Sequence, residues 1–154
     1  MTNAAPSNRR RVAGPPDTTG SGRHNMLIVD DQAVMRALLR DFMQSSIHGL
    51  EVSEAGDGAR ALKLAQERRP QVVLMDINLP DANGIELTAR LRELLPDTRV
   101  ILVTSQAGSA YVERARAAGA FGYVTKDKIY AELAPLVAAA LNPPPARDGE
   151  GSAT

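Results

Sequence analysis

The sequence of 154 residues contains no cysteine and no tryptophan, and its aromatic residues are three tyrosines and two phenylalanines. Without cysteine the chain has no disulfide framework, no thiol nucleophile and no thiolate metal ligand. Two isolated histidines, His24 and His48, are too few for a histidine-rich metal site. The core must therefore be built from Leu, Val, Ile, Ala and Met, and a hydrophobic content of 44% is sufficient for one.

Net charge and long apolar runs are also absent. Eighteen basic residues balance eighteen acidic ones, so no overall field draws the chain to nucleic acid or to a membrane. No apolar run approaches the roughly 18 residues of a membrane span, and the N-terminus lacks the apolar segment of a secretory signal. We therefore expect a soluble cytoplasmic protein, and the length predicts one domain.

Both ends of the sequence lack hydrophobic periodicity. Residues 1–25 hold prolines, glycines, serines and the triplet Arg9–Arg11, and residues 142–154 begin with a run of prolines. We interpret both as disordered tails around a single domain at residues 26–141. The arginine triplet suits an acidic partner or nucleic acid, but we interpret it as a solvated basic segment.

Between the tails, predicted strands alternate with predicted helices. The unbroken apolar runs 26–29 and 72–75 are typical of strands that are covered on both faces. Apolar residues spaced by three and four between residues 32 and 46 predict a helix. The predicted strands are residues 26–29, 50–54, 72–75, 99–103 and 121–125. The predicted helices are residues 32–46, 58–69, 84–95, 110–118 and 129–141.

Pro135 falls inside the last predicted helix. A proline in a helix interior costs about 3 kcal/mol, whereas the first turn tolerates it because its N–H groups have no partner. We therefore expect this helix either to start late, near Ala131, or to bend at Pro135.

The alternation predicts an α/β fold, a doubly wound sheet of five parallel strands in the flavodoxin-like order 2-1-3-4-5. In that order the first and third strands are neighbours. Asp30 and Asp31 directly follow the first strand, and Asp76 directly follows the third. Because ligands of such sheets bind at the carboxyl ends of the strands, we expect the three carboxylates to share one crevice.

Three carboxylates at close range repel one another, and a divalent cation relieves that repulsion. Ligands that are all oxygen favour Mg²⁺ or Mn²⁺. A metal beside Asp76 indicates phosphoryl chemistry on that carboxylate, since carboxylates serve as phosphoryl acceptors. Thr104, at the end of the fourth strand, offers a hydroxyl donor, and Lys126, just past the fifth, offers an ammonium. The alternative that Asp30 and Asp31 cap the following helix explains one aspartate better than two.

Taken in order, these residues resemble the receiver domain of bacterial two-component response regulators, the CheY-like family. The resemblance covers about residues 25–141, and each motif stands at the end of a successive strand. Its motifs are Asp30-Asp31, Met75-Asp76-Ile77-Asn78-Leu79-Pro80, Gly84, Thr104-Ser105 and Gly122-Tyr123-Val124-Thr125-Lys126.

The resemblance implies a role for each residue of the acidic crevice. Asp76 matches the phosphoacceptor, and the implied donor is a histidine kinase or a phosphotransfer protein. Asp30 and Asp31 match the acidic pair that holds Mg²⁺ together with Asp76, and the backbone carbonyl of Asn78 matches a further ligand. Such a domain is no enzyme in the ordinary sense, because it catalyses only its own phosphorylation and dephosphorylation.

The resemblance also implies a conformational switch. Thr104 matches the hydroxyl that moves toward the phosphoryl group, Lys126 the lysine that contacts it, and Tyr123 the aromatic ring that follows Thr104. The surface formed by the fourth helix, fifth strand and fifth helix then binds a downstream protein, or a second copy in a phosphorylation-dependent homodimer of an otherwise monomeric chain. Asp127 stands where many receivers have a proline, and this Lys-Asp form resembles the subgroup that often precedes a helix-turn-helix domain.

The leading hypothesis is thus a stand-alone phospho-acceptor switch with no direct contact to nucleic acid or membrane. One alternative is the N-terminal fragment of a DNA-binding response regulator, and another is a pseudo-receiver that binds partners without phosphorylation. An aspartyl-phosphate enzyme would require a second acid where Asn78 stands. A flavin carrier would require a phosphate-binding loop in place of the acidic residues after the first strand.

Overall fold

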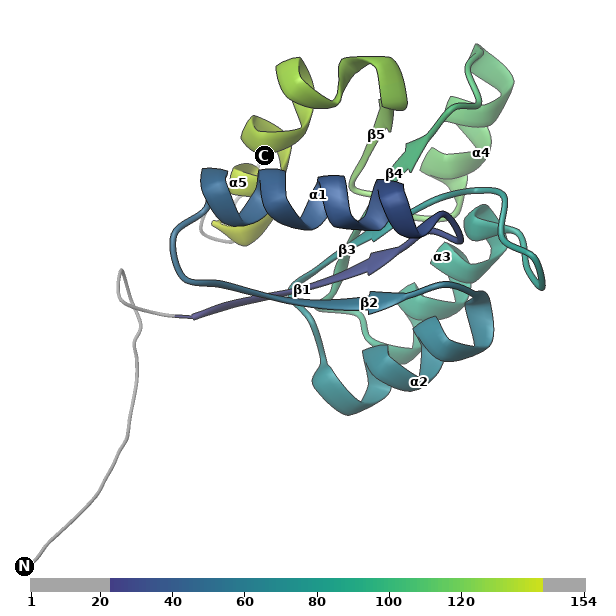
Figure 1. Cartoon of the computed structure of the whole chain (residues 1–154). Coiled ribbons are helices and arrows are strands. Elements are labelled where there is room, and N and C mark those ends of the chain that lie inside the picture. Colours follow the sequence, from purple (N-terminus) through teal and green to yellow (C-terminus); the bar gives the residue numbers. More distant parts are fainter. Residues whose placement is uncertain (1–22, 143–154) are drawn as a thin grey trace, which may run out of the picture.

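A computed structural model describes residues 23–142, which form one α/β unit (Figure 1). Five parallel strands lie in the order β2-β1-β3-β4-β5, which confirms the predicted fold and strand order. The strands are β1 (His24–Val29), β2 (Leu50–Ala55), β3 (Val72–Met75), β4 (Arg99–Thr104) and β5 (Gly122–Thr125). The prediction of disordered tails falls on residues 1–22 and 143–154, outside the described residues, and β1 begins two residues earlier than predicted.

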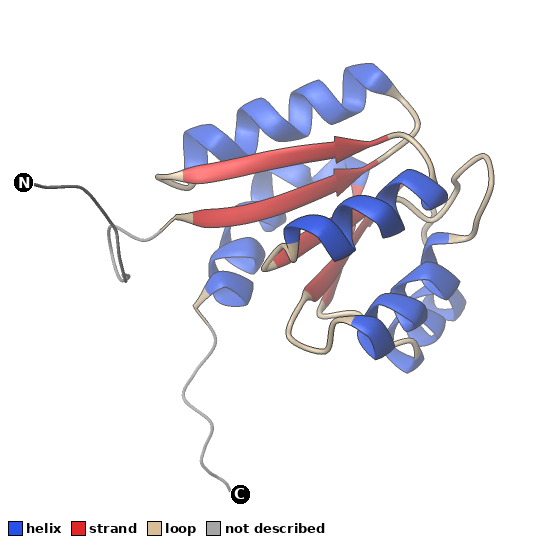
Figure 2. Cartoon of the chain, turned by 90° about the horizontal axis from the view of Figure 1, so that it is seen from below, coloured by secondary structure: helices blue, strands red, loops and turns tan. Residues whose placement is uncertain are grey.

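The helices cover the two faces of the sheet. Those on one face are α1 (Ala33–Ser46) and α5 (Ala134–Leu141), and those on the other are α2 (Gly58–Arg68), α3 (Gly84–Leu94) and α4 (Ser109–Ala117) (Figures 1 and 2). None of the helices within residues 23–142 is both long and apolar enough to cross a membrane.

The core forms two apolar layers, one on each face of the sheet. Met26 and Ile28 of β1 point into the layer under α1 and α5, whereas Leu27 and Val29 point into the layer over α2 and α3. All four side chains are at most 1% exposed. This explains why β1 is apolar at every position instead of alternating, because both of its faces are buried.

The helix ends follow local rules at most positions. Asp57 accepts a hydrogen bond from the N–H of Arg60 at 2.7 Å and caps α2. Asn83 caps α3 in the same way. Arg69 takes a left-handed conformation, with φ of 47°, at the end of α2.

The last α-helix starts late, which is one of the two expectations for Pro135, but it starts at Ala134 and not near Ala131. The chain forms a 3-10 turn at Lys126–Lys128 and a π-helical turn at Ile129–Leu133 before α5 begins. Pro135 therefore lies in the first turn of α5, where its missing N–H costs little. A wider turn before a proline removes the clash between its ring and the carbonyl four residues earlier.

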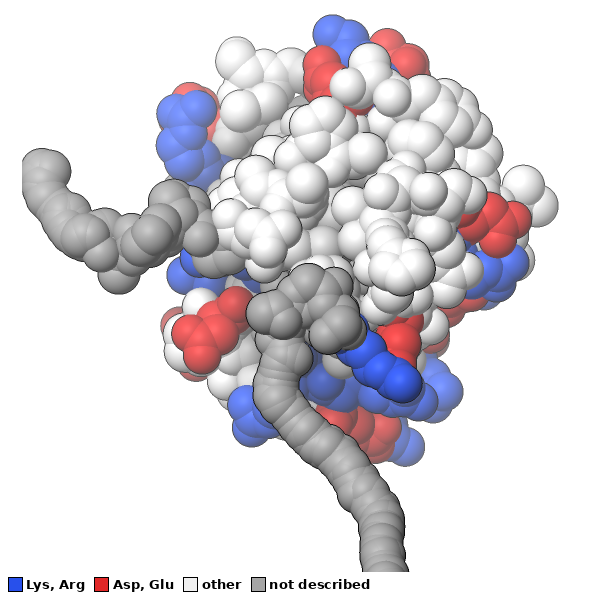
Figure 3. Space-filling model, turned by 90° about the vertical axis from the view of Figure 1, so that its left-hand side faces the viewer, with Lys and Arg blue, Asp and Glu red and all other residues white. Residues whose placement is uncertain are grey.

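The surface of α5 is free of charged side chains. α5 contains no charged residue, and Tyr130, just before it, is 69% exposed and meets the ring of Phe42 edge to face. Figure 3 shows a broad uncharged area with Lys, Arg, Asp and Glu around its edges, most of them below it. The phosphoryl chemistry predicted from the sequence lies elsewhere, at the carboxyl edge of the sheet.

Candidate functional site

The strand register places two aspartates side by side. Val29 of β1 pairs with Met75 of β3, so the next residues, Asp30 and Asp76, leave the sheet together. Both are buried, Asp30 at 1% and Asp76 at 7% exposure. Asp31 is exposed beside them, and one carboxylate oxygen of each of the three lies within 4.8 Å of the others. The structure thus brings together the three carboxylates that the sequence predicted to share a crevice.

Lys126 is shared between two of these carboxylates. Thr104 pairs with Thr125 in the sheet, and Lys126 follows directly. Its Nζ lies 2.9 Å from Oδ2 of Asp30 and 3.0 Å from Oδ2 of Asp76. Partial burial works to lower the pKa of Lys126, but the two carboxylates outweigh it and hold that pKa above its usual value. Three carboxylates against one ammonium leave the group with a formal excess of two negative charges.

The carboxylate of Asp30 is buried and only partly satisfied by hydrogen bonds. Its Oδ1 accepts the N–H of Gln32 at 2.9 Å, whereas its buried Oδ2 has no well-directed hydrogen-bond donor within residues 23–142. The 2.9 Å contact of Oδ2 with Lys126 is therefore an ion pair with poor hydrogen-bond geometry. Burial raises the pKa of Asp30 and the charge of Asp76 raises it further, although Lys126 and the Gln32 N–H oppose both.

This arrangement fits a divalent cation with oxygen ligands. A cation such as Mg²⁺ would balance the excess negative charge and supply a partner for Oδ2 of Asp30. The alternative role of the aspartates as caps of α1 fails, because the N-cap of α1 is Gln32 and it has no side-chain cap bond. Asn78 is exposed two residues after Asp76, and the role of its carbonyl as a ligand stays a prediction.

Gly84 explains how α3 approaches the acceptor so closely. It is buried at the first position of α3, and its N–H donates to the carbonyl of Ile77 at 2.7 Å. A Cβ at this position would overlap the backbone carbonyl oxygen of Asp76. Only glycine therefore lets the start of α3 lie against the backbone of the acceptor.

Two predicted switch residues, Thr104 and Tyr123, meet at Gln106. Thr104 is fully buried, and its Oγ1 accepts the N–H of Gln106 at 3.2 Å. The hydroxyl of Tyr123 donates to the carbonyl of Gln106 at 2.7 Å. Burial raises the pKa of Tyr123, and Tyr111 and Asp76 add to that rise. One residue of the loop between β4 and α4 is thus held by both side chains, through the two successive peptide groups that flank it.

Comparison with known families decides the class of the protein. The sequence model described as the response regulator receiver domain matches residues 26–138. The chain belongs to the response regulator receiver domain family. Receiver domains bind Mg²⁺ at a cluster of aspartates, and the Asp30, Asp31 and Asp76 group of this receiver is such a cluster.

Individual relatives of this receiver are regulators of transcription by name. It is 41% identical over 101 residues to the transcriptional activator protein ExaE of Pseudomonas putida, covering 66% of this chain and 47% of that protein. It is 39% identical over 112 residues to the DNA-binding transcriptional activator DevR/DosR of Mycobacterium tuberculosis, covering 73% and 52%. The chain thus spans about half the length of these curated relatives.

A solved structure agrees with the fold. A two-component response regulator of the LuxR family from an Aurantimonas species superposes with a TM-score of 0.73 at 36% identity. The match covers 78% of this chain and 86% of that one. The receiver fold is therefore shared with a solved response regulator.

Sequence reasoning missed two residues that organise the loops of the site. Arg36 of α1 donates through Nη1 to the carbonyl of Asp30 at 2.6 Å, and its Nε lies 3.1 Å from Oε1 of Glu54 on β2. Asp81 accepts two N–H groups at the start of α2. Glu54 lies 18 residues from Arg36, and Gly58 lies 23 residues from Asp81, so neither of these contacts has a local sequence signal.

Proposed function

We propose that this receiver is the phospho-acceptor switch of a two-component system, with Asp76 as the acceptor. A phosphohistidine of a histidine kinase or of a phosphotransfer protein is the donor. A carboxylate oxygen of Asp76 attacks phosphorus, the bond from phosphorus to the histidine nitrogen breaks, and the electron pair stays on that nitrogen. The observation that carries the proposal is a charge-unbalanced group, in which exposed Asp31 lies beside buried Asp30 and Asp76, and these two share a single Lys126.

We assign the metal ligands to Asp30, Asp31, Asp76 and the backbone carbonyl of Asn78. Bound there, Mg²⁺ (or Mn²⁺) would offset the charge of the carboxylates and of the incoming phosphoryl oxygens. Asp30 and Asp31 hold the negative charge that such a cation requires. The acceptor carboxylate of Asp76 stays oriented because Lys126 and the backbone around Gly84 hold it in place.

Lys126 and Thr104 are the residues we assign to the phosphoryl group itself. Nζ of Lys126 already contacts Asp76 and would donate to a phosphoryl oxygen attached to it. The Thr104 hydroxyl lies at the end of the neighbouring strand β4. A phosphoryl group adds a charge of about −1.5 to −2, which attracts both donors.

We assign the output of the switch to Thr104 and Tyr123. Movement of Thr104 toward the phosphoryl group removes its bond to Gln106, whose carbonyl also holds the Tyr123 hydroxyl. The loop after β4 then rearranges and changes the face formed by α4, β5 and α5. A downstream protein binds this face, or a second receiver does so in a phosphorylation-dependent homodimer.

The names of the relatives favour a second candidate, in which this receiver is the N-terminal part of a DNA-binding response regulator. The relatives ExaE and DevR/DosR are transcriptional activators about twice as long as the matched region. In that case the partner of the switched face is an output domain, and the receiver itself makes no contact with nucleic acid. In both cases we assign the receiver to residues 26–141 and place it in the cytoplasm, away from the membrane.

Phosphorylation with a small donor tests the proposal. Wild type and Asp76→Ala are incubated with acetyl phosphate, with and without Mg²⁺, and intact mass is recorded. We expect one added phosphoryl group that requires Mg²⁺ and is absent from Asp76→Ala. Absence of labelling in a wild-type protein that binds Mg²⁺ would instead indicate a pseudo-receiver, a partner-binding module without phosphorylation.

A further inference from the structure

Asp81 lies at the tip of the loop between β3 and α3, yet its side chain bonds to a different element. Its Oδ1 accepts the N–H of Gly58 at 2.7 Å, and its Oδ2 accepts the N–H of Ala59 at 3.0 Å. Gly58 and Ala59 are the first two residues of α2, where helix N–H groups lack partners of their own. Both carboxylate oxygens of Asp81 are thus engaged by α2.

The loop between β3 and α3, which has Asp81 at its tip, forms a small closed hairpin. The N–H of Leu79 donates to the carbonyl of Ala82 at 3.2 Å, and Asn78 and Asn83 form an antiparallel bridge. The base of the hairpin is fixed where Gly84 lies against the backbone of Asp76. The bonds of Asp81 to α2 fix the opposite end. Asn78, with the carbonyl assigned to the cation, lies between these two fixed points.

The approach of the loop to α2 is tight. A Cβ added to Gly58 would lie 2.8 Å from the Cβ of Ala82 and 3.2 Å from Oδ1 of Asp81. Real side chains do not approach so closely, so this contact requires a glycine at the start of α2. The hairpin tip and the helix therefore meet surface to surface, and the hydrogen bonds of Asp81 set their relative position.

We propose that Asp81 is a positioning residue for the cation site, and this inference rests on the proposed function of Asp76 and its neighbours. By tying the hairpin to α2, Asp81 holds the Asn78 carbonyl in place before the cation arrives. A hairpin without this tie would have to be ordered at the cost of binding free energy. Asp81 contacts neither the cation ligands nor the phosphoryl group and acts only through the loop.

Asp57 provides a matched control, because it caps the same helix without contacting the loop. Its side chain accepts the N–H of Arg60 at 2.7 Å, a bond as short as the shorter one made by Asp81. Asp57→Ala therefore weakens the start of α2, whereas Asp81→Ala weakens the start of α2 and frees the hairpin. Comparing the two separates the stability of α2 from the position of the loop.

Mn²⁺ binding, followed by the electron paramagnetic resonance signal of free Mn²⁺, tests the inference on the full chain. Loss of indirect support for metal ligands weakens binding, and we expect a dissociation constant about three- to tenfold higher for Asp81→Ala. Asp57→Ala should stay within about twofold of wild type although its melting temperature also falls. Asp81→Asn keeps one acceptor oxygen, so its affinity should lie between wild type and Asp81→Ala.

A kinetic measurement adds a readout that a purely structural role would not change. With acetyl phosphate, labelling of Asp81→Ala should be slow at low Mg²⁺ and should approach the wild-type rate at saturating Mg²⁺. Equal Mn²⁺ affinity of wild type, Asp81→Ala and Asp81→Asn would overturn the inference and leave the proposed function intact. Equal weakening by Asp57→Ala would also overturn it, because α2 stability would then be the cause. A wild-type protein that binds no Mn²⁺ would overturn the proposed function and this inference together.

Discussion

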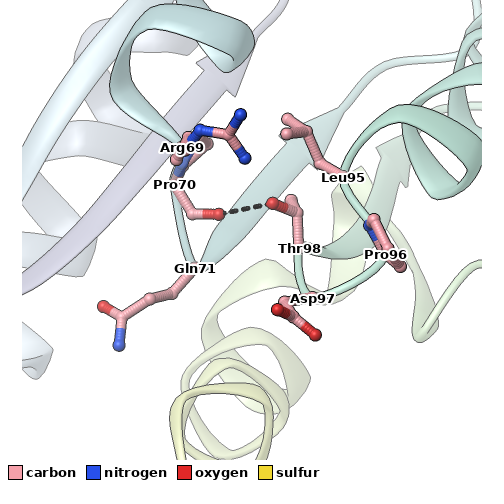
Figure 4. Close-up of a pocket in the computed structure, with 7 residues that line it drawn as sticks. All are labelled: Arg69, Pro70, Gln71, Leu95, Pro96, Asp97 and Thr98. Atoms are coloured by element: carbon pink, nitrogen blue, oxygen red, sulfur yellow. Dashed lines mark hydrogen bonds between the residues drawn. The ribbon is translucent and has the colours of Figure 1, made fainter.

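At the amino-terminal edge of the sheet, Asn25 and Thr98 donate to backbone carbonyls, and the buried Nδ1 of His24 lacks a partner within residues 23–142 but bears no opposed charge. At the carboxyl edge, charged side chains crowd against one another. The buried hydroxyl of Thr98 donates to the carbonyl of Pro70 at 2.7 Å, beside a pocket of about 240 Å³ (Figure 4). Asn25 donates to the carbonyl of Arg68 at 2.8 Å. At the other edge, Asp30 and Asp76 share Lys126, and Oδ2 of Asp30 lacks a directed donor.

This difference shows how structural and functional polar groups are distinguished. A buried polar group that is fully paired stabilises its loop and needs no further ligand. A buried charge that is left unbalanced costs stability, and such a cost persists where a ligand will offset it. Pocket shape alone would not separate the two edges, since a pocket also lies at Thr98, where the buried hydroxyl already has a partner.

The largest expected effect on stability comes from crowding the backbone at the carboxyl edge of the sheet. Gly84→Ala places a methyl group on the carbonyl of Asp76, so we expect the free energy of unfolding to fall by about 3 kcal/mol. Urea unfolding measures this loss. Gly56→Ala is the control, because within 4 Å its new Cβ would meet the guanidinium of Arg36, at 3.3 Å from Nη1, and no backbone atom of any distant residue that the structure describes. Equal losses for both variants would show that the backbone contact at Asp76 has no special cost.

The second effect comes from the shared lysine. Lys126→Gln leaves Asp30 and Asp76 without their ammonium, and we expect a loss of about 2 kcal/mol in the absence of divalent cations. Added Mg²⁺ should restore part of that loss, because binding to the folded state stabilises it. The exposed pair of Arg116 and Glu113 is the control, and Arg116→Gln should cost less than about 0.5 kcal/mol. A loss that Mg²⁺ leaves unchanged would contradict the charge-balance argument.

The third effect concerns the amino-terminal edge. Thr98→Val preserves shape but leaves the buried carbonyl of Pro70 without its donor, which should cost about 1 to 2 kcal/mol. Mg²⁺-dependent labelling by acetyl phosphate should stay at the wild-type level, because the whole sheet separates Thr98 from Asp76. Thermal unfolding and labelling are measured on the same preparation. Slower labelling would show that the two edges are coupled and would break the comparison.

The sequence predicts the sheet and the acidic group well because both depend on strong, repeated signals. Unbroken apolar runs mark strands covered on both faces, and strand order then brings Asp30 and Asp76 together. Contacts between distant segments are not predictable in this way. The bonds of Arg36 to Glu54 and of Asp81 to α2 depend on how separate elements meet in space.

The late start of the last α-helix was predicted, but its first residue, Ala134, was not. The sequence shows that an α-helix interior does not tolerate this proline, but not which alternative the chain adopts. A late start, a bend and a π-helical turn differ little in local free energy, and packing of Leu133 and Val137 into the core selects the turn at Ile129–Leu133. Hydrophobic periodicity in the sequence does not predict helix boundaries that are set by such packing.

The smallest expected effect is a pH dependence that distinguishes Asp81 from Asp30. Bonds from the Gly58 and Ala59 N–H groups lower the pKa of Asp81 below 3.8, its usual value. Its ionised form therefore stabilises the fold above that pH, and this contribution is lost as the pH falls through the lowered pKa. Burial raises the pKa of Asp30, so the pH dependence of its contribution to stability has the opposite sign. That contribution is present below pH 3.8 and is lost as the pH rises through the raised pKa.

We therefore expect Asp81→Asn to be less stable than wild type at neutral pH, with a difference that shrinks as the pH falls below 3.8. Urea unfolding of both proteins between pH 7 and the acid limit of folding measures that difference. Thr98→Val removes no titratable group, so the loss of stability that it causes should be the same at every pH in this range. A difference for Asp81→Asn that is as constant as that of Thr98→Val would show that the charge of Asp81 does not hold α2. The tie between the hairpin and α2 would then depend on shape, through Gly58 and Ala82, and not on the carboxylate.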